Sequence, residues 1–365
     1  MRSPAWRPAT LPAGGLLLFV SLAGWWIDQP LFFAAWLSAW WFCLGVVLGA
    51  TANGWLHTLT GGAWGELLWP STRQLQRRLP WVLLLFLPML LGIHVVYPWS
   101  ADPQGWLASM DHPAFQQHWF DLRFFGLRLV AYALLWAWMA RAGRVRQPGR
   151  AAAMMALHTL VTSLAAVDLL MSLVPAWSSS VFGWLALMGQ MTAGAAASIL
   201  LAALGGAAPR PAREAPPVWR DLGNLLLMFV LVQAYLQFMQ FLIIWAENLP
   251  REISWFVPRL QTGWSAVGLA LVLLQFAAPL LALLWRSNKD RPRRLACIAG
   301  GLLAMQAVDA AWLVVPSVQA QGFGAWWQLP LVFGGMALLL FGQLDPRPQT
   351  DRRPSGAAWQ EPANG

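Results

Sequence analysis

Two aspartates, Asp168 and Asp309, lie within long apolar segments of this sequence. A charged side chain at the centre of a membrane costs about 2.5–3.5 kcal/mol on insertion scales, so such residues usually face a cavity or a partner. Arg128 and Arg259 lie near the ends of two other apolar segments, at a matching depth. The spacing predicts one arginine–aspartate pair in each half of the chain. Such a pair either fixes helix packing or tunes a carboxyl group that exchanges protons.

Histidine titrates near neutral pH, so histidines in apolar segments are the next candidates for proton chemistry. His158 shares its segment with Asp168 and lies close to Thr162, which predicts a polar track through one half of the molecule. His94 lies near the end of an earlier segment and is followed by Tyr97. A lone histidine at a helix end is more often a packing or surface residue; the alternative is a hydrogen-bond donor to a ligand.

A row of polar side chains runs along a third segment. Gln233, Gln237, Gln240 and Glu247 follow one another at spacings of four, three and seven residues, which places them on one face of a helix. Uncharged glutamines often serve only as contacts between helices, worth about 1 kcal/mol each. The alternative is a water-lined path along this face that carries protons towards the outer end of the helix.

Ligands for a redox centre are missing from the sequence. There is no glycine-rich phosphate loop, no histidine pair spaced to hold haem, and no dense set of metal-binding side chains. The two cysteines, Cys43 and Cys297, cannot hold an iron–sulfur cluster, which usually needs four thiolates, and both are expected to be buried and inert. The chain is therefore expected to bind no metal and to leave electron chemistry to a diffusible cofactor and a partner.

The composition indicates which elements position these residues. Of 365 residues, 58% are hydrophobic and 11% are charged, against about 25% charged in an average soluble protein. Lipid must therefore cover much of the outside. Roughly 20 apolar residues cross a bilayer as a helix. Ten such helices are predicted, near 11–27, 31–53, 80–98, 122–142, 151–175, 180–205, 222–246, 259–285, 294–316 and 323–343.

The basic residues predict the orientation of these helices. The net charge is +9, but the basic residues sit in short loops between apolar segments, which argues against nucleic acid. Ten crossings place both ends and all but four of the 24 Lys and Arg on one side. The exceptions are Arg123, Arg128, Arg251 and Arg259. Basic loops stay in the cytoplasm, so the tails, 1–10 and a disordered 345–365, are expected there, on either side of a membrane domain at 11–344.

Two connecting segments carry further features. Residues 54–79 mix tryptophan and leucine with arginine, which indicates a helix lying on the cytoplasmic surface of the membrane. The longest outer loop, 99–121, carries aspartates and histidines, among them Asp111 and His112. This loop is a candidate for contact with a partner or for a cover over the outer face.

Two motifs recur at matching places in the chain. Phe-x-x-Arg-Leu occurs at 125–129 and at 256–260, where it opens the fourth and eighth predicted helices. Val-Asp followed by Val-Pro at the same spacing closes the fifth and ninth. An offset of four helices preserves direction, so parallel repeats are expected. The second to fifth helices, about 31–175, and the sixth to ninth, about 180–316, would form two four-helix bundles with the first and tenth helices outside.

Several stretches resemble the smaller quinone-type membrane subunit of bacterial alternative complex III (ActF), one of the NrfD and polysulfide-reductase-like membrane subunits. Together with the paired bundles, the resemblance covers roughly residues 10–345. The stretches are 57–65 (HTLTGGAWG), 87–94 (LPMLLGIH), 97–99 (YPW), 221–226 (DLGNLL) and 242–250 (LIIWAENLP).

The resemblance implies ten helices, eight of them in two four-helix bundles, and a place in a respiratory quinol:cytochrome c (electron acceptor) oxidoreductase of the bacterial inner membrane. It implies three kinds of partner: a larger homologous quinone-binding membrane subunit, an iron–sulfur subunit, and c-type cytochrome subunits. The haem and iron–sulfur clusters belong to those partners. Menaquinone or ubiquinone is expected mainly in the larger subunit; if one also binds this chain, His94 and Tyr97 would face it.

Taken together, the sequence predicts a non-redox membrane subunit that is not catalytic alone. The expected proton relay contains Asp168, Asp309 and His158 with the polar row Gln233, Gln237, Gln240 and Glu247. Arg128 and Arg259 would tune the carboxyl groups. Two other functions stay open. A secondary transporter would show broken helices near the middle of the membrane, and a structural anchor would tolerate neutral residues at both aspartates.

Overall fold

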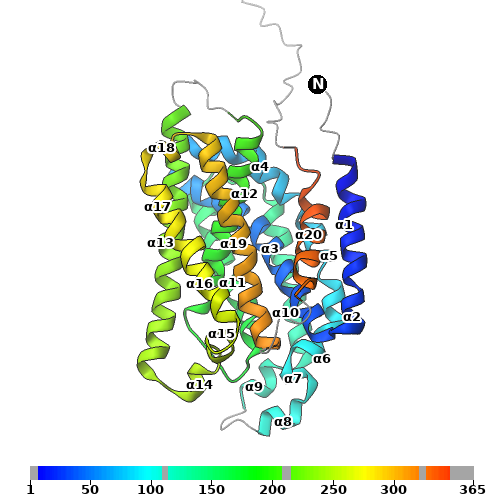
Figure 1. The fold of residues 1–365 in the computed structure, drawn as a ribbon. Coiled ribbons are helices and arrows are strands. Elements are labelled where there is room, and N and C mark those ends of the chain that lie inside the picture. The colour runs from blue at the N-terminus through cyan, green and yellow to red at the C-terminus, as the bar shows by residue number, and fades with distance from the viewer. Residues whose placement is uncertain (1–6, 109–113, 208–214, 320–325, 346–365) are drawn as a thin grey trace, which may run out of the picture.

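The computed structural model describes residues 7–108, 114–207, 215–319 and 326–345, and all regular secondary structure in these ranges is helical (Figure 1). Within them, nine helical segments are long and apolar enough to cross a membrane. The prediction of an all-α polytopic membrane protein is confirmed. The nine segments are Ala9–Ile27, Gln29–Thr60, Trp64–Val96, Leu122–Arg141, Pro148–Leu173, Phe182–Leu204, Pro217–Glu247, Trp264–Leu284 and Pro292–Val318.

Some crossings are one continuous helix and others are built from several short ones. As far as the middle of the chain, the elements are α1 (Arg7–Ser21), α2 (Ala23–Ile27), α3 (Gln29–Thr60), α4 (Trp64–Gln76), α5 (Leu79–Leu84), η1 (Leu87–Gly92), α6 (Ile93–Val96), α7 (Pro98–Ala101), α8 (Pro103–Ala108), α9 (Gln116–Trp119), α10 (Leu122–Arg141), α11 (Pro148–Leu169), η2 (Met171–Leu173) and α12 (Phe182–Leu204). The others are α13 (Ala215–Glu247), α14 (Pro250–Ile253), α15 (Val257–Leu260), α16 (Trp264–Leu271), η4 (Val272–Ala277), α17 (Ala278–Leu284), α18 (Arg286–Lys289), α19 (Pro292–Val318) and α20 (Gln328–Phe341).

The tenth predicted helix is shorter than a full crossing in the described residues. α20 has 14 residues, fewer than the roughly 20 that span the hydrocarbon, and residues 320–325 before it lie outside the described part. The second predicted helix is longer than expected. α3 continues past the apolar stretch to Thr60, where Gly61 with a φ of 74° ends it, because glycine adopts the left-handed conformation of a helix end without strain.

α3 is the central helix of the molecule. In its most apolar stretch 94% of the residues are buried, against 28% in α13. Small residues let α12 approach it closely: a Cβ atom on Gly49 would overlap the backbone of Gln190, and one on Gly194 would overlap Ala50. Backbones that approach this closely gain van der Waals contact, which drives helix association in lipid.

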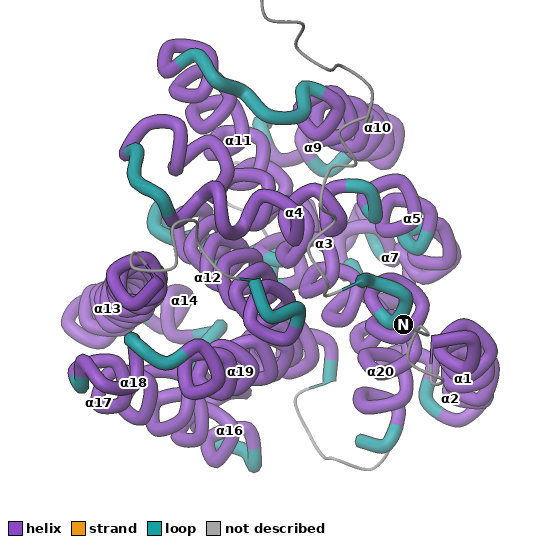
Figure 2. Tube along the Cα trace, turned by 90° about the horizontal axis from the view of Figure 1, so that it is seen from above, coloured by secondary structure: helices purple, strands orange, loops and turns teal. Residues whose placement is uncertain are grey.

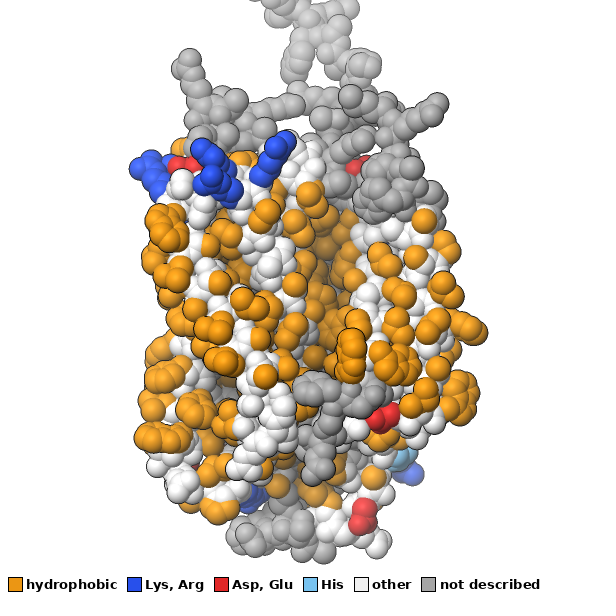
Figure 3. All heavy atoms as spheres, viewed as in Figure 1, with side chains coloured by type: hydrophobic (Ala, Val, Ile, Leu, Met, Phe, Trp, Pro, Cys, Tyr) orange, Lys and Arg blue, Asp and Glu red, His pale blue; other side chains and the backbone are white. Residues whose placement is uncertain are grey.

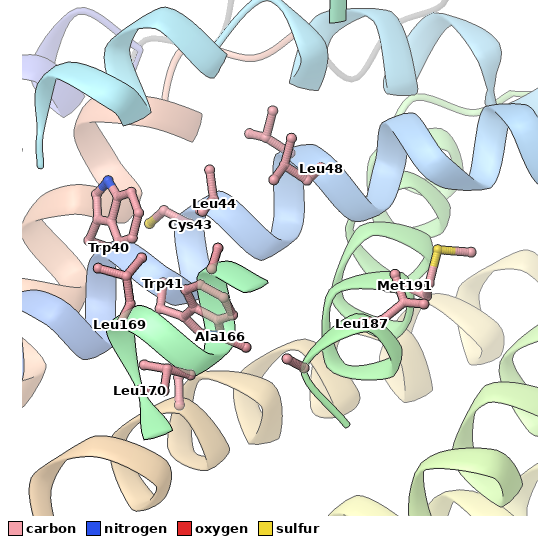
Figure 4. Close-up of a cluster of buried hydrophobic side chains, with 14 of the residues drawn as sticks. Trp40, Trp41, Cys43, Leu44, Leu48, Ala166, Leu169, Leu170, Leu187 and Met191 are labelled. Atoms are coloured by element: carbon pink, nitrogen blue, oxygen red, sulfur yellow. The ribbon is translucent and has the colours of Figure 1, made fainter. Parts of the chain in front are cut away.

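Figure 4 shows the centre of the core, where side chains of three helices meet. This cluster is almost wholly apolar, so dispersion and packing hold it rather than hydrogen bonds. The core side chains drawn there come from α3, from α11 with its C-terminal residue, and from α12: Trp40, Trp41, Cys43, Leu44, Leu48, Ala166, Leu169, Leu170, Leu187 and Met191.

The other helices surround α3 and α12. Viewed along the bundle, α10 and α11 lie on one side, α13, α16 and α17 on another, and α1 with α20 on a third (Figure 2). α3 packs against α11, α12, α19 and α20, and α12 packs against α19. Helices assigned to the two expected bundles therefore contact one another directly at the centre. The division into two repeats remains a prediction.

The predicted surface helix corresponds to α4, which crosses one end of the bundle and contacts α3, α12 and α13 (Figures 1 and 2). Its buried face carries Leu67, Leu68 and Leu75, and its opposite face exposes Glu66 and Arg73. This division between an apolar and a charged face is typical of a helix that lies at the membrane interface.

The outer surface is apolar over most of its height, and Lys and Arg side chains gather at the end from which α1 starts (Figure 3). At this end Arg220 holds Asp290 through two hydrogen bonds of 2.8 and 3.0 Å. The Arg220 guanidinium lowers the pKa of Asp290 by stabilising its ionised form.

Some sequence predictions on single residues have other outcomes. Cys43 is buried as expected, but Cys297 is exposed, because its neighbours Ala296 and Ala299 face inwards on α19. The outer loop 99–121 contains the short helices α7, α8 and α9. Asp111, His112 and the predicted disordered tail from residue 346 lie outside the described residues.

Candidate functional site

The first predicted pair is present. The Arg128 guanidinium donates to both carboxylate oxygens of Asp168, Nε to Oδ2 at 2.7 Å and Nη2 to Oδ1 at 3.0 Å. Tyr132 donates a third hydrogen bond to Oδ2 at 2.7 Å. Asp168 is fully buried. The two fork-like hydrogen bonds and the phenol occupy both oxygens, so this carboxylate is fixed in place.

Arg128 is itself held from several directions. Nη2 donates to the backbone oxygen of Trp119 at 2.8 Å, and the guanidinium carbon lies 4.2 Å from the Trp119 ring centre and 4.5 Å from that of Phe124. Arginine stacks well on aromatic rings because its charge is spread over a plane. The pair therefore ties α10 to α11 and to the short helix α9.

The second predicted pair is absent. Arg259 donates to the backbone oxygens of Trp255, Trp312 and Leu313 at 2.6–3.2 Å and to the Ser317 hydroxyl at 2.8 Å. The prediction that Arg259 tunes Asp309 is therefore wrong.

The reason lies in α19, where Pro316 stands inside the helix. Proline has no backbone N–H and leaves the carbonyl four residues earlier without its helical donor. That carbonyl belongs to Trp312, and Arg259 Nε occupies it. The guanidinium also lies 3.5 Å from the ring centre of Trp255, so Arg259 is already fully engaged by backbone and aromatic partners.

Asp309 is surrounded by amides instead of a cation. It is only 5% exposed and forms no ion pair with any described residue. Gln233 Nε2 donates to its Oδ2 at 3.5 Å, and Gln233 Oε1 in turn accepts from Gln306 at 2.8 Å and from Thr192 at 3.1 Å. In the described part of the chain, Oδ1 of Asp309 has no hydrogen-bond partner.

His158 belongs to a separate buried cluster between α11 and α12. Its Nδ1 lies 3.3 Å from the Thr162 hydroxyl, which is 3.4 Å from Gln190 Oε1. The Trp55 ring packs against the imidazole with the ring centres 5.8 Å apart. The predicted track through this half therefore runs from His158 to Gln190, while Asp168 is engaged by Arg128.

Two small cavities lie beside these clusters. One, of about 30 Å³, is lined by Gln190, Gln306 and Asp309 among apolar residues. The other, of about 10 Å³, is lined by Thr192, Gln233, Gln237 and Gln275. A cavity needs about 10–15 Å³ and several polar neighbours to hold a water molecule. The larger one is big enough, and water there would bridge the His158 cluster to Asp309 through Gln190.

The polar residues of the row on α13 differ in how deeply they are buried. Gln233 and Gln240 are buried, Gln237 is half-buried, and Glu247 is exposed at the end of the helix. Gln240 Oε1 accepts from the Ser179 hydroxyl at 3.2 Å. Gln237, Gln240 and Asp309 also line a groove of about 670 Å³ between α13, α16, η4 and α19. The row thus connects Asp309 to this groove.

His94 and Tyr97 do not take part in this site. His94 is exposed and its Nδ1 lies 2.9 Å from the Ser100 backbone oxygen. Tyr97 is buried and donates to the backbone oxygen of Leu169 at 3.0 Å, where α11 ends and its last carbonyls need donors. Neither residue lines a described cavity. These contacts point to structural roles instead of the predicted contact with a quinone.

Sequence reasoning missed Tyr132, Gln306, Gln190 and Thr192, and helix periodicity could have found the first two. Tyr132 lies four residues after Arg128, and Gln306 lies three before Asp309, so each shares a helix face with a residue that the sequence singled out. Gln190 on α12 carries no such signal, because its importance comes from the helices packed around it.

Comparison with models of known protein families finds no match for this chain, and no curated protein matches it. The function of the chain is therefore inferred from its own residues.

Proposed function

We propose that this chain is a membrane subunit of a quinol-oxidising respiratory complex of the alternative complex III type, in which it handles protons. It lies in the bacterial inner membrane with both termini in the cytoplasm. Its partners are a larger homologous membrane subunit, an iron–sulfur subunit and c-type cytochromes. The single observation that carries the proposal is Asp309, a carboxyl group buried among membrane-spanning helices without a counter-cation in the described chain.

A carboxyl group in this setting is suited to exchange protons. Asp168 accepts two hydrogen bonds from the Arg128 guanidinium, whereas Asp309 has no cation beside it in the described chain. The Gln233 amide, which is bonded to Asp309, can both donate and accept hydrogen bonds, so it can stabilise Asp309 in either protonation state. Water in the 30 Å³ cavity would provide the connection towards Gln190 and His158.

Quinol oxidation releases electrons and protons. In the proposed complex the haem and iron–sulfur clusters of the partner subunits take the electrons. Asp309, His158 and the amides of Gln190, Gln233 and Gln306 act on the protons, and the pair of Arg128 and Asp168 holds the other half of the bundle in place. The basic end of the molecule (Figure 3) supports the cytoplasmic assignment of the termini.

The proposal is tested with Asp309→Asn in the assembled complex, reconstituted in lipid vesicles with a pH dye inside. We expect quinol-driven proton release to fall by about tenfold or more, because proton transfer by a positioned group typically contributes about 100-fold or more to a rate. Asp221→Asn is the matched control, since Asp221 is an exposed carboxylate in the same half of the chain. Unchanged proton release in the Asp309 variant would instead favour a structural anchor.

A secondary transporter is the second candidate, and η4 favours it. This π-helical turn, Val272–Ala277, interrupts the crossing beside Gln275 and the 10 Å³ cavity. Transporters often place their binding sites where helices are interrupted. Uptake of a solute by the purified chain alone, in vesicles without redox partners, would favour this candidate over the respiratory one.

A further inference from the structure

The groove of about 670 Å³ opens through the apolar surface of the molecule. Its rim contains Tyr235 and Phe238 from α13 and Leu269 from α16, which are 58–60% exposed. Its inner end contains Asp309 and Gln240, which are buried. Because these three rim residues lie on membrane-spanning segments, a molecule can enter the groove from the lipid. The volume is in the range of about 300–1,000 Å³ that is typical of small-molecule sites.

The inner end of the groove carries polar atoms without partners. Among the described residues, Oδ1 of Asp309 accepts no hydrogen bond, and the indole N–H groups of Trp255 and Trp312 donate none. All three residues line the groove. A buried polar group without a hydrogen bond has lost its contact with water and gained nothing in return, so a ligand that supplies the bond stabilises the complex. A ligand with both a donor and an acceptor at its head would satisfy them.

The charge of the lining excludes an anionic head group. Among the described residues, Asp309 provides its sole carboxyl group, and no Lys or Arg lines the groove. A phosphate placed beside this carboxyl group would lack any counter-cation and would meet a like charge. The head of the ligand is therefore neutral.

The shape and composition of the walls favour a flat ring. Aromatic rings attract one another in offset or edge-to-face arrangements, beyond the effect of the area they bury. The aromatic side chains of the groove are Tyr235, Phe238, Phe241, Trp255, Phe256, Phe276 and Trp312. One wall includes Val272 and Phe276 of η4, and π-helical turns of this kind are frequent at functional sites.

A second cavity provides an internal comparison. It has nearly the same volume, about 660 Å³, and lies between α16, α19 and α20. Its lining includes the indole N–H groups of Trp264 and Trp326, but no carboxyl, amide or hydroxyl side chain among the described residues. Hydrocarbon chains can fill this cavity, but it has no side-chain oxygen to accept a hydrogen bond from a head group. The polar inner end distinguishes the groove beside Asp309.

We propose that this groove binds a membrane-dissolved lipid with a planar, hydroxylated ring as its head and a long hydrocarbon tail. A ring hydroxyl donates to Oδ1 of Asp309, a ring oxygen accepts from the indole N–H of Trp255 or Trp312, and the tail leaves past Leu269. The proposed function places the main quinol site on a larger partner subunit. This inference adds a site on the present chain and rests on the geometry of the groove.

The test uses the full chain in lipid nanodiscs with a photoreactive alkyl benzoquinol as the probe. Cross-links should map to α13, η4 and α19 around Asp309. A short-chain alkyl hydroquinone should suppress them in competition, and phosphatidylglycerol should not. Equal suppression by phosphatidylglycerol, or cross-links confined to the apolar cavity at Ala307, would overturn the proposal.

Two variants and a control sharpen this test. Asp309→Asn should weaken binding of the hydroquinone about tenfold or more, since an amide oxygen accepts a hydrogen bond less strongly than a carboxylate oxygen does. Gly268→Leu should abolish binding, because its side chain would fill the groove next to Trp312. Gly301→Leu is the matched control in open space on α19 and should bind normally.

If Asp309→Asn and Gly268→Leu both bind the hydroquinone with the affinity of the unaltered chain, the site is refuted. This readout is independent of quinol turnover. If the probe does not bind in the groove, but Asp309→Asn lowers proton release in the reconstituted complex as expected, the binding site is refuted and the proposed proton role stands. Binding at the groove together with unchanged proton release in Asp309→Asn would refute the proposed proton role and leave the binding site standing.

Discussion

Asp168 and Asp309 occupy matching positions in the two halves of the chain, each in a Val-Asp motif before a Val-Pro. Their surroundings differ. Asp168 receives two hydrogen bonds from Arg128 and one from Tyr132. Asp309 receives one long hydrogen bond from Gln233 and lines a cavity and a groove.

The difference comes from the arginine partner. Arg128 reaches its aspartate across α10 and α11, whereas Arg259 is held by the carbonyl that Pro316 leaves free on α19. One half of the molecule thus uses its buried carboxylate to join helices. The other half keeps its carboxyl group free of a cation and next to space that water or a ligand can occupy. The same motif serves packing in one half and, as proposed, proton exchange in the other.

The largest expected effect on stability comes from breaking the Arg128–Asp168 pair in the first half of the chain. Arg128→Leu leaves Asp168 buried without a cation and should lower the free energy of unfolding by about 3–5 kcal/mol. Thermal unfolding in mild detergent measures this. The double variant Arg128→Leu/Asp168→Leu should recover most of the loss, since apolar residues replace buried ion pairs at little net cost. A double variant no more stable than the single one would contradict the structural role of the pair.

The next largest effect on the free energy of unfolding is expected at Arg259. Arg259→Leu removes the donors to Trp312 and Leu313 and should destabilise the protein by about 1–3 kcal/mol. Pro316→Ala restores a backbone N–H for the Trp312 carbonyl, so Arg259→Leu should cost about 1 kcal/mol less in that background. A double-mutant cycle on thermal unfolding gives the coupling. Zero coupling would show that Pro316 is not the reason for the position of Arg259.

A smaller effect is expected at Asp309. Asp309→Asn removes no ion pair and keeps the size of the side chain, so the free energy of unfolding should change by about 1 kcal/mol or less. Asp168→Asn should cost several times more, because it leaves Arg128 unpaired. The ratio of the two losses in thermal unfolding measures the difference between the halves directly. Equal losses of unfolding free energy in Asp309→Asn and Asp168→Asn would contradict a structural difference between the two halves.

The smallest effect is at the basic end, outside the membrane. The pKa of Asp290 is lowered by Arg220, so the ionised form contributes stability above the unfolded pKa of about 4. This contribution should disappear as the pH falls below 4. The melting temperature of Asp290→Asn should therefore lie slightly below that of the unaltered chain at pH 7 and converge with it under acid conditions. A difference that persists in acid would point to a cause other than charge.

Much of the fold could be predicted from the sequence. Hydrophobic length predicts that the helices exist, because it depends on neighbouring residues only. The end of α3 at Thr60 was not predicted, since its apolar stretch ends near residue 53. The Arg128–Asp168 contact was also predicted, since depth in the membrane restricts which residues can meet. Central packing of α3 on α12 through Gly49 and Gly194 could not be predicted, because small residues occur throughout the sequence.

The candidate site was predicted less well. Asp309 was identified by its charge and Gln233 by its place in the polar row, but their contact was not predicted. Nor were the hydrogen bonds that Gln306 and Thr192 donate to Gln233, because polar contacts between helices depend on rotations that the sequence does not specify. Arg259 was assigned to the wrong partner, since a guanidinium binds backbone carbonyls as readily as a carboxylate. His94 and Tyr97 were assigned to a ligand by residue type, whereas their bonds go to Ser100 and Leu169.

The difference between the two aspartates is tested most directly by infrared difference spectroscopy between two pH values on the purified chain. A carboxyl band that changes with pH should vanish in Asp309→Asn and persist in Arg128→Leu/Asp168→Leu. That result would assign proton exchange to the second half of the molecule. A band that persists in Asp309→Asn and vanishes with Asp168 would contradict it.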